Sequence, residues 1–340
     1  MSADSPSPVT NAPAPLSNSA ASFDPHRARP ATLEWPFDGS ERRNPKSYVG
    51  ESIVVAMDGS PEADAAARVA DAIASKLQGS IHAMSVVDTT PVPIPFPLDV
   101  SFAMAAETAN GDIHRQQERD LRNRIAALLS HPIEWPTKVE LGVPADAIAH
   151  EATRLEAALI VMGLRHRHGI DRVVHRETTL AVMRKAPGPV LGVVARAAGL
   201  PAHAVVAMDF TRASIQAAVA TARLMSGGGR LTLAFVESML EFPPGSSESV
   251  LHTLGLDAAF SRLTSALATN VLNVDHVILH HTKPASPSRV LLDHVEGAGV
   301  DLLAAGSVRH GRLDRIMLGS VSAELVRDAT CSVLIVPPEA

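Results

Sequence analysis

One five-residue segment occurs twice in the chain, 151 positions apart, and this repetition constrains the fold more than any other feature. Val-Val-Ala-Met-Asp stands at 54–58 and again at 205–209. Two later segments repeat at a spacing of 143: 159–163 resembles 302–306, and 189–193 resembles 332–336. The first copy is therefore longer by eight residues, and the Pro-rich stretch 91–97 belongs to that difference. A repeat of this kind predicts two copies of one domain.

Each copy alternates short apolar runs with longer segments of helical periodicity. The first copy predicts a strand at 53–57, a helix capped by Ser60 and ended by Gly79, and a strand at 81–87. The second predicts a strand at 204–208, a helix capped by Thr211 and broken by glycines at 227–229, and a strand at 231–236. Further strands are expected at 138–141 and 277–281, long helices at 112–129 and 254–271, and shorter ones from 145 and 288. This order predicts an α/β fold with parallel strands and right-handed crossovers.

Composition narrows the class of protein. Hydrophobic residues make up 46% of the chain but aromatic ones only 3%, so the cores must be aliphatic. A net charge of −6 argues against a nucleic-acid-binding surface. The first residues have no basic start and no apolar core, and no apolar run reaches the roughly 20 residues of a membrane helix. We therefore expect a cytoplasmic protein that binds neither nucleic acid nor membrane.

The segment 1–48 is rich in Pro, Ser and Ala, and we expect it to be a disordered arm. The two domains are expected at 49–197 and 201–338. The single cysteine, Cys331, excludes an internal disulfide, and its apolar neighbours predict a small buried side chain rather than a reactive thiol.

The second copy contains residues suited to binding phosphate. Ligands of open α/β sheets lie beyond the carboxyl ends of the strands. There the chain has Gly306, and later Gly319 and Ser320 directly before a helix. Glycine lets backbone N–H groups approach an anion closely, and a helix N-terminus adds unpaired donors and a positive dipole end.

From these residues the chain resembles the universal stress protein family, as a tandem member, over about residues 50–340. Nucleotide-binding members have the pattern G-x2-G-x9-G-[ST] after the fourth strand, an Asp after the first and a Val at the end of the second. The resemblance implies, for each domain, a doubly wound five-stranded parallel sheet of order 3-2-1-4-5 flanked by helices. It also implies an ATP site, with or without Mg²⁺, in the second domain. That site would contain Ala207, Asp209, Val236, Ala305, Gly306, Arg309, Gly319, Ser320, Val321 and Ser322.

Both copies depart from the family pattern. In the second, Arg309 replaces the middle glycine, where it would either crowd the phosphate path or bind a phosphate with its guanidinium group. The first copy keeps Asp58, Val86 and Gly163. It has His166 at the middle glycine and Arg176-Glu177 at the Gly-Ser position, which places a carboxylate at the expected helix start. We expect one nucleotide site at most.

The sequence predicts no metal site and no catalytic residues. The histidines at 166, 168 and 175 lack metal-ligand spacing, although the basic residues around them leave a weak anion site open. His280 and His281 are adjacent on an expected strand and point to opposite faces.

The expected role is regulation of a stress response by nucleotide binding, without enzymatic activity. Two alternatives stay open: a nucleotide-free interaction module of the same family, and a slow ATP hydrolase with Asp209 near the metal. The resemblance also implies an intramolecular pseudo-dimer through the fifth strands, 190–194 and 333–336. A further homodimer and an unidentified protein partner stay open.

Overall fold

The computed structural model describes residues 50–88, 100–129, 135–165, 172–238, 247–267, 272–281, 286–309 and 316–338. The expected N-terminal arm, the Pro-rich stretch 91–97 and the His166–His168 run lie outside these ranges. The predictions made for them stay untested.

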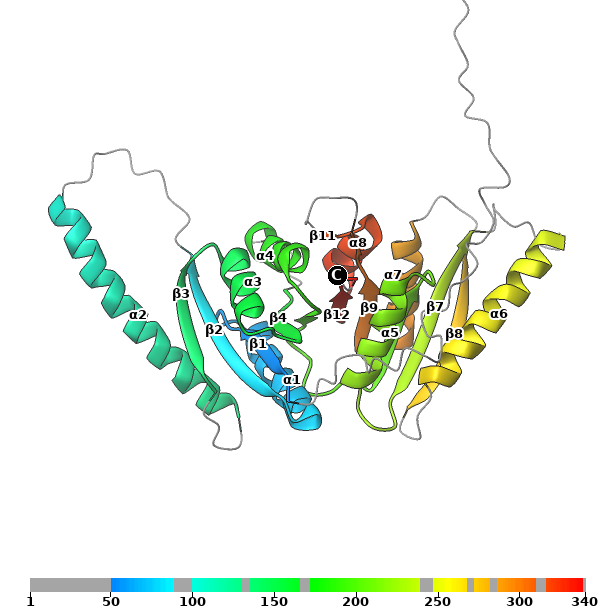
Figure 1. Cartoon of the computed structure of the whole chain (residues 1–340), viewed down its shortest axis with the longest axis horizontal. Helices are drawn as coiled ribbons and strands as arrows, with labels where there is room; N and C mark the ends of the chain where they lie inside the picture. The colour runs from blue at the N-terminus through cyan, green and yellow to red at the C-terminus, as the bar shows by residue number, and fades with distance from the viewer. Residues whose placement is uncertain are drawn as a thin grey trace, which may run out of the picture. The chain divides into compact units, whose positions relative to one another are not determined.

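Within the described residues, ten strands form one sheet of order β3-β2-β1-β4-β5-β12-β9-β6-β7-β8 (Figure 1). Those of the first copy are β1 (Ser52–Ala56), β2 (Ser80–Asp88), β3 (Thr137–Gly142), β4 (Leu159–Gly163) and β5 (Val190–Val193). Those of the second are β6 (His203–Met208), β7 (Arg230–Ser238), β8 (Asn273–His281), β9 (Leu302–Gly306) and β12 (Ser332–Val336). Each half therefore has the predicted 3-2-1-4-5 order, with parallel pairing throughout.

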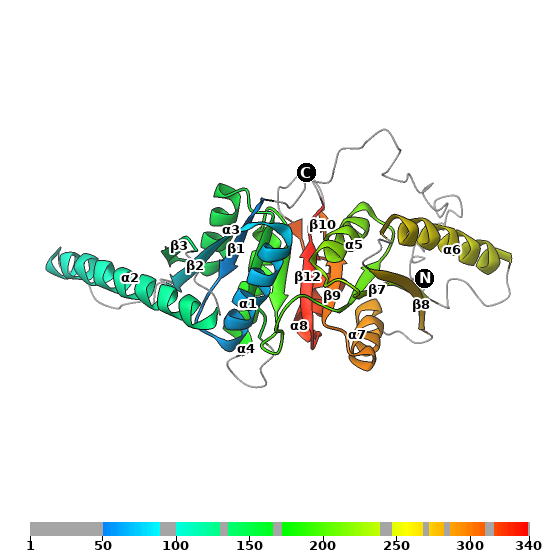
Figure 2. The same ribbon diagram turned by 90° about the horizontal axis from the view of Figure 1, so that it is seen from below.

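The two halves join through their fifth strands, as the resemblance implied. β5 and β12 pair antiparallel, with Leu334 opposite Leu191 and Ile335 opposite Val190, and Figure 2 places β12 next to β9 near the middle of the sheet. All residues of both strands are buried. Lys76 at the end of the first helix adds a polar link, because its ammonium donates to the carbonyls of Arg223 and Met225 in the second half.

The helices connect successive strands and cover both faces of the sheet. They are α1 (Pro61–Leu77), α2 (Val100–Leu128), α3 (Pro144–Arg154), α4 (Arg172–Lys185), α5 (Arg212–Leu224), α6 (Ser247–Leu267), α7 (Pro287–Ala298) and α8 (Ser320–Asp328). One hydrophobic cluster contains residues of α3, α4, α7 and α8 together with strand residues of both halves. The second face receives α1, α2, α5 and α6, with α2 beside β3 and α6 beside β8 (Figure 1).

Several boundaries differ from the predicted ones. α2 begins at Val100 instead of 112, because the Ala-rich segment before Gly111 continues the helix. α6 is displaced toward the N-terminus by several residues, and β8 begins four residues earlier than expected. At the end of α1, Gln78 and not Gly79 adopts the left-handed conformation, with φ of 54°. Gly79 is needed for space instead, since a Cβ there would lie 2.9 Å from the Glu51 carbonyl oxygen.

A buried carboxylate fixes α3 to the sheet. The side chain of Glu151 is only 4% exposed and accepts hydrogen bonds from Arg154 at 2.6 Å and Lys138 at 2.7 Å. These hydrogen bonds, that of Arg154 above all, lower the pKa of Glu151 to about 2 against the opposing effect of burial. Glu151 is therefore ionised over the whole physiological pH range.

Candidate functional site

The strand ends of the second half bring most of the predicted site together. Ala207 on β6 lies directly opposite Ala305 on β9, so Asp209 and Gly306 follow at the same edge of the sheet. Val236 lies near the end of the next strand, β7, with its own partner on β8. These residues lie at the carboxyl ends of neighbouring strands, which is where ligands of open α/β sheets bind.

Gly306, the first glycine of the expected phosphate loop, is required by packing. A Cβ at this position would lie 2.5 Å from the Ala213 carbonyl carbon, because α5 passes directly over the end of β9. Gly163 is in the same situation, since a Cβ there would lie 2.9 Å from the Ala63 amide nitrogen of α1. This glycine therefore serves the fold in both halves and gives no information about a ligand.

Packing against the described residues does not require a glycine at position 319. It is the N-cap of α8 with φ of −58° and ψ of 159°, a conformation open to any residue. No atom of the described residues, apart from its chain neighbours, lies within 4 Å of the place that a Cβ would take. A Ser, Thr, Asp or Asn would cap the helix at least as well. The absence of a side chain at 319 leaves the first amides of α8 open to a ligand.

Two contacts define the rest of the loop. The hydroxyl of Ser322, in the first turn of α8, donates to the Gly306 carbonyl at 3.0 Å and joins the two ends of the expected motif. Arg309 lies in the short strand β10 (Val308–Arg309), which pairs antiparallel with β11 (Ile316–Met317). β11 in turn contacts α4 of the first half. The Arg309 side chain lies outside the described atoms, so its two predicted roles stay open.

Asp209 shapes the turn between β6 and α5. Its Oδ1 accepts from the Thr211 amide at 2.9 Å and from the Thr211 hydroxyl at 2.6 Å, and the Thr211 hydroxyl caps α5 by accepting from the Ser214 amide. The carboxylate itself is exposed. Asp209 thus has the local role that Asp often has in such turns.

Phe210, between these two residues, has φ of 58°, which is unfavourable for a bulky side chain. Its ring packs edge-to-face on the fully buried Phe260 of α6, with centroids 4.8 Å apart, and lies 5.8 Å from the ring of Phe235. Aromatic packing thus offsets the backbone strain. The first half has Gly59 at the equivalent position, with φ of 77°.

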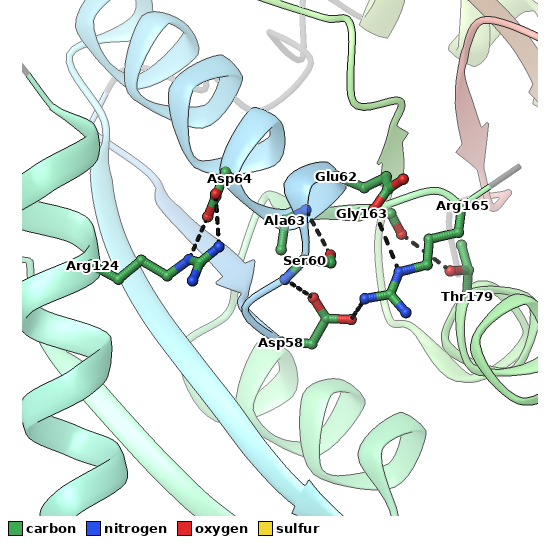
Figure 3. A network of polar contacts seen from close by, with 9 residues as sticks. All are labelled: Asp58, Ser60, Glu62, Ala63, Asp64, Arg124, Gly163, Arg165 and Thr179. Atoms are coloured by element: carbon green, nitrogen blue, oxygen red, sulfur yellow. Dashed lines mark hydrogen bonds and ion pairs between the residues drawn. The ribbon is translucent and has the colours of Figure 1, made fainter. Parts of the chain in front are cut away.

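At the equivalent strand ends, the first half pairs its own charged side chains with one another (Figure 3). The Arg165 guanidinium lies 3.2 Å from the Asp58 carboxylate and 3.4 Å from that of Glu62. Asp58 also accepts from the Ser60 amide at 2.9 Å, while Ser60 caps α1 through the Ala63 amide. The sequence did not reveal the partner of Asp58, because Arg165 follows it by 107 positions. In the second half Val308 stands where the first has Arg165.

The start of α4 corrects one prediction. Arg176 and Glu177 do not stand at a helix N-terminus, because α4 begins at Arg172. α8 begins only at Ser320, the equivalent of Glu177, although the two helices end at equivalent residues. Without a glycine at 176 the helix continues for five more residues toward its N-terminus. The amides that would bind phosphate at this level are therefore inside the first-half helix.

The sequence also raised the questions of a metal site, of the roles of His280 and Cys331, and of a membrane helix. Over the described ranges, no group of three His, Cys, Asp or Glu side chains could hold a metal ion. His280 pairs with Glu237 at 3.1 Å, and His252 of α6 pairs with the same carboxylate at 2.8 Å. Cys331 is 1% exposed, which confirms the predicted small buried side chain, and burial raises the pKa of its thiol to about 11. None of the helices in the described part of the chain has the length and apolar character needed to cross a membrane.

Comparison with known proteins gives one consistent result. The sequence profile of the universal stress protein family matches the chain twice, at residues 51–193 and 202–337. A universal stress protein of Methanocaldococcus jannaschii is 28% identical over 145 residues, which are 42% of this chain and 80% of the relative.

Two solved structures share the fold of the tandem pair. A universal stress protein from Archaeoglobus fulgidus superposes with a TM-score of 0.53 at 16% identity, covering 86% of this chain and 98% of its own. A putative universal stress protein from Pseudomonas aeruginosa gives a TM-score of 0.52 at 14% identity, covering 86% and 95%. At these identities the likeness concerns the fold alone.

Proposed function

The chain belongs to the universal stress protein family as a tandem two-domain member, and we propose that its second domain binds one adenine nucleotide, ATP, at the loop formed by Gly306, Gly319 and Ser320. The first domain binds none. Nucleotide binding would then alter the conformation or assembly of a stress-response regulator.

The single observation that supports this proposal most is Gly319. Neither the backbone conformation nor packing against the described residues requires a glycine there, whereas a phosphate group that approaches the first turn of α8 does. In the proposal, the amides of Ser320, Val321 and Ser322 bind the phosphates, and Ser320 adds its hydroxyl. The exposed carboxylate of Asp209 and the strand end at Val236 border the nucleoside.

The charges of the two halves support a single site. In the first domain Arg165 pairs with Asp58 at the strand ends, and α4 presents no N-terminus at the phosphate level. Within the described residues of the second domain, Val308 stands in place of Arg165 and α8 begins at Ser320. Any Mg²⁺ would be bound chiefly by the nucleotide phosphates, because the described residues provide no preformed metal site.

The proposal is tested by identifying and titrating the ligand. Purified protein is denatured and any released nucleotide identified; ATP is then titrated by calorimetry. Saturable binding that Ser320→Glu abolishes supports the proposal, and no heat of binding at millimolar ATP refutes it in favour of the nucleotide-free module. Phosphate release above background that disappears in Asp209→Ala would establish the slow hydrolase instead.

A separate variant decides the role of Arg309. If the arginine crowds the phosphate path, Arg309→Gly strengthens ATP binding. If the guanidinium group binds a phosphate, the same change weakens binding by about tenfold, the value of one charge-assisted hydrogen bond.

A further inference from the structure

A polar network around one fully buried hydroxyl, that of Ser288, joins α8 to the start of α7. Oε2 of Glu324, in the second turn of α8, accepts from the Ser286 hydroxyl at 3.0 Å and also from the Ser288 hydroxyl. Ser286 is the N-cap of α7, and its hydroxyl lies 2.8 Å from that of Ser288, which is fully buried. The carboxylate therefore lies at the positive end of α7, where a negative charge is favoured.

The first domain has none of the three polar residues. At the positions equivalent to Ser286, Ser288 and Glu324, each 143 residues earlier, stand Val143, Ala145 and Ala181. There the corresponding helices, α3 and α4, are joined by a pair between Asp146 and Lys185 at the surface, with both side chains about half exposed. The network thus occurs in the domain that has Gly319 and Ser320, and is replaced by apolar residues in the domain that does not.

The position of Glu324 explains what this network does. It lies one helical turn after Ser320, on a helix of nine residues whose N-cap has no side chain. Such a short helix depends on tertiary contacts for its stability and orientation. The Ser322 hydroxyl holds the first turn of α8 to β9, and Glu324 holds the next turn to α7. Together they fix both the direction and the rotation of α8.

We propose that Glu324 is a positioning residue for the phosphate-binding turn: by holding α8 on the N-terminus of α7, it keeps the amides of Ser320, Val321 and Ser322 aimed at the phosphates. This inference rests on the proposed function for its ligand. The orientation of α8 can be tested without a nucleotide.

The test compares Glu324→Ala with Glu324→Gln in the full chain. Glu324→Ala is expected to raise the Kd for ATP by about tenfold, the value of one charge-assisted hydrogen bond, and to leave adenosine binding unchanged, because adenosine lacks phosphates. Glu324→Gln keeps an oxygen acceptor for the serines and should retain most of the affinity. Asp146→Asn breaks the equivalent helix pair of the first domain and should leave ATP binding unchanged.

Amide hydrogen exchange in the nucleotide-free chain provides a second readout. Glu324→Ala should accelerate exchange at residues 320–324, and Asp146→Asn should not; Ser288→Ala serves if Glu324→Ala fails to fold. Unchanged exchange together with unchanged ATP affinity, or equal losses for ATP and adenosine, would overturn the positioning role. If the wild-type chain binds no ATP, the proposed function fails, and the exchange data alone decide whether Glu324 orders this turn.

Discussion

Replacing Gly319 by Asp should make the protein more stable and abolish nucleotide binding at the same time. Asp is a better N-cap than Gly by a few tenths of a kcal/mol, and a negative charge at the start of α8 adds about 0.3–1 kcal/mol. Because no atom of the described residues, apart from its chain neighbours, crowds this position, little is lost to packing. For domains of this size the gain corresponds to a rise in Tm of about 1–4 °C.

The same substitution should weaken the binding of ATP. A carboxylate about 4 Å from a phosphate oxygen is repelled by about 4 kcal/mol at an effective dielectric constant of 20. Even if screening removes half of that energy, the loss of affinity is at least about tenfold to a hundredfold. A residue that improves the helix and abolishes binding would show that the glycine serves the ligand.

Val143→Asp is the matched control. Val143 is the half-exposed N-cap of α3 in the first domain and has no polar side chain to cap its helix. The substitution should give a similar rise in Tm in thermal melts while calorimetry shows unchanged ATP binding. A fall in Tm for Gly319→Asp, or ATP affinity equal to that of the wild type, would refute the reasoning about Gly319.

Three further outcomes follow from the contacts described above. Gly306→Ala should lower stability by about 1–3 kcal/mol or more, with or without nucleotide, because its Cβ would overlap the start of α5; urea unfolding measures this. Glu151→Gln should cost about 1–2 kcal/mol at pH 7, after discounting for the exposure of its cations. Since the folded pKa of Glu151 is about 2 and the unfolded one about 4.5, the difference from wild type should disappear between these values as the pH falls. Cys331 should resist thiol reagents in the native protein and react only on unfolding.

The repeat made the architecture predictable. Matched segments at both ends of each copy implied two equal sheets, and the family resemblance supplied the strand order and the pairing of β5 with β12. Element boundaries were less accurate where good helix formers extend a helix past a glycine, as before Gly111. Local capping at Ser60 and Thr211 was correct because it depends on neighbouring residues alone.

The site was predictable only in outline. The sequence identified the glycines but not which of them the fold requires, since the overlap of Gly306 with Ala213 arises from the packing of a helix on a distant strand. The pairing of Asp58 with Arg165 and of Ser288 with Glu324 joins residues 107 and 36 positions apart, and no local pattern announces either. A comparison of the two copies with each other would have helped, because it identifies the positions at which only one copy has a polar residue.

The number of nucleotides bound per chain tests the central claim most directly. Calorimetric titration of the full-length protein with ATP should give one site per chain, none in Gly319→Asp, and still one in a variant that removes Asp58 of the first domain. Two sites per chain, or a single site that survives Gly319→Asp and is lost with Asp58, would contradict the assignment of nucleotide binding to the second domain.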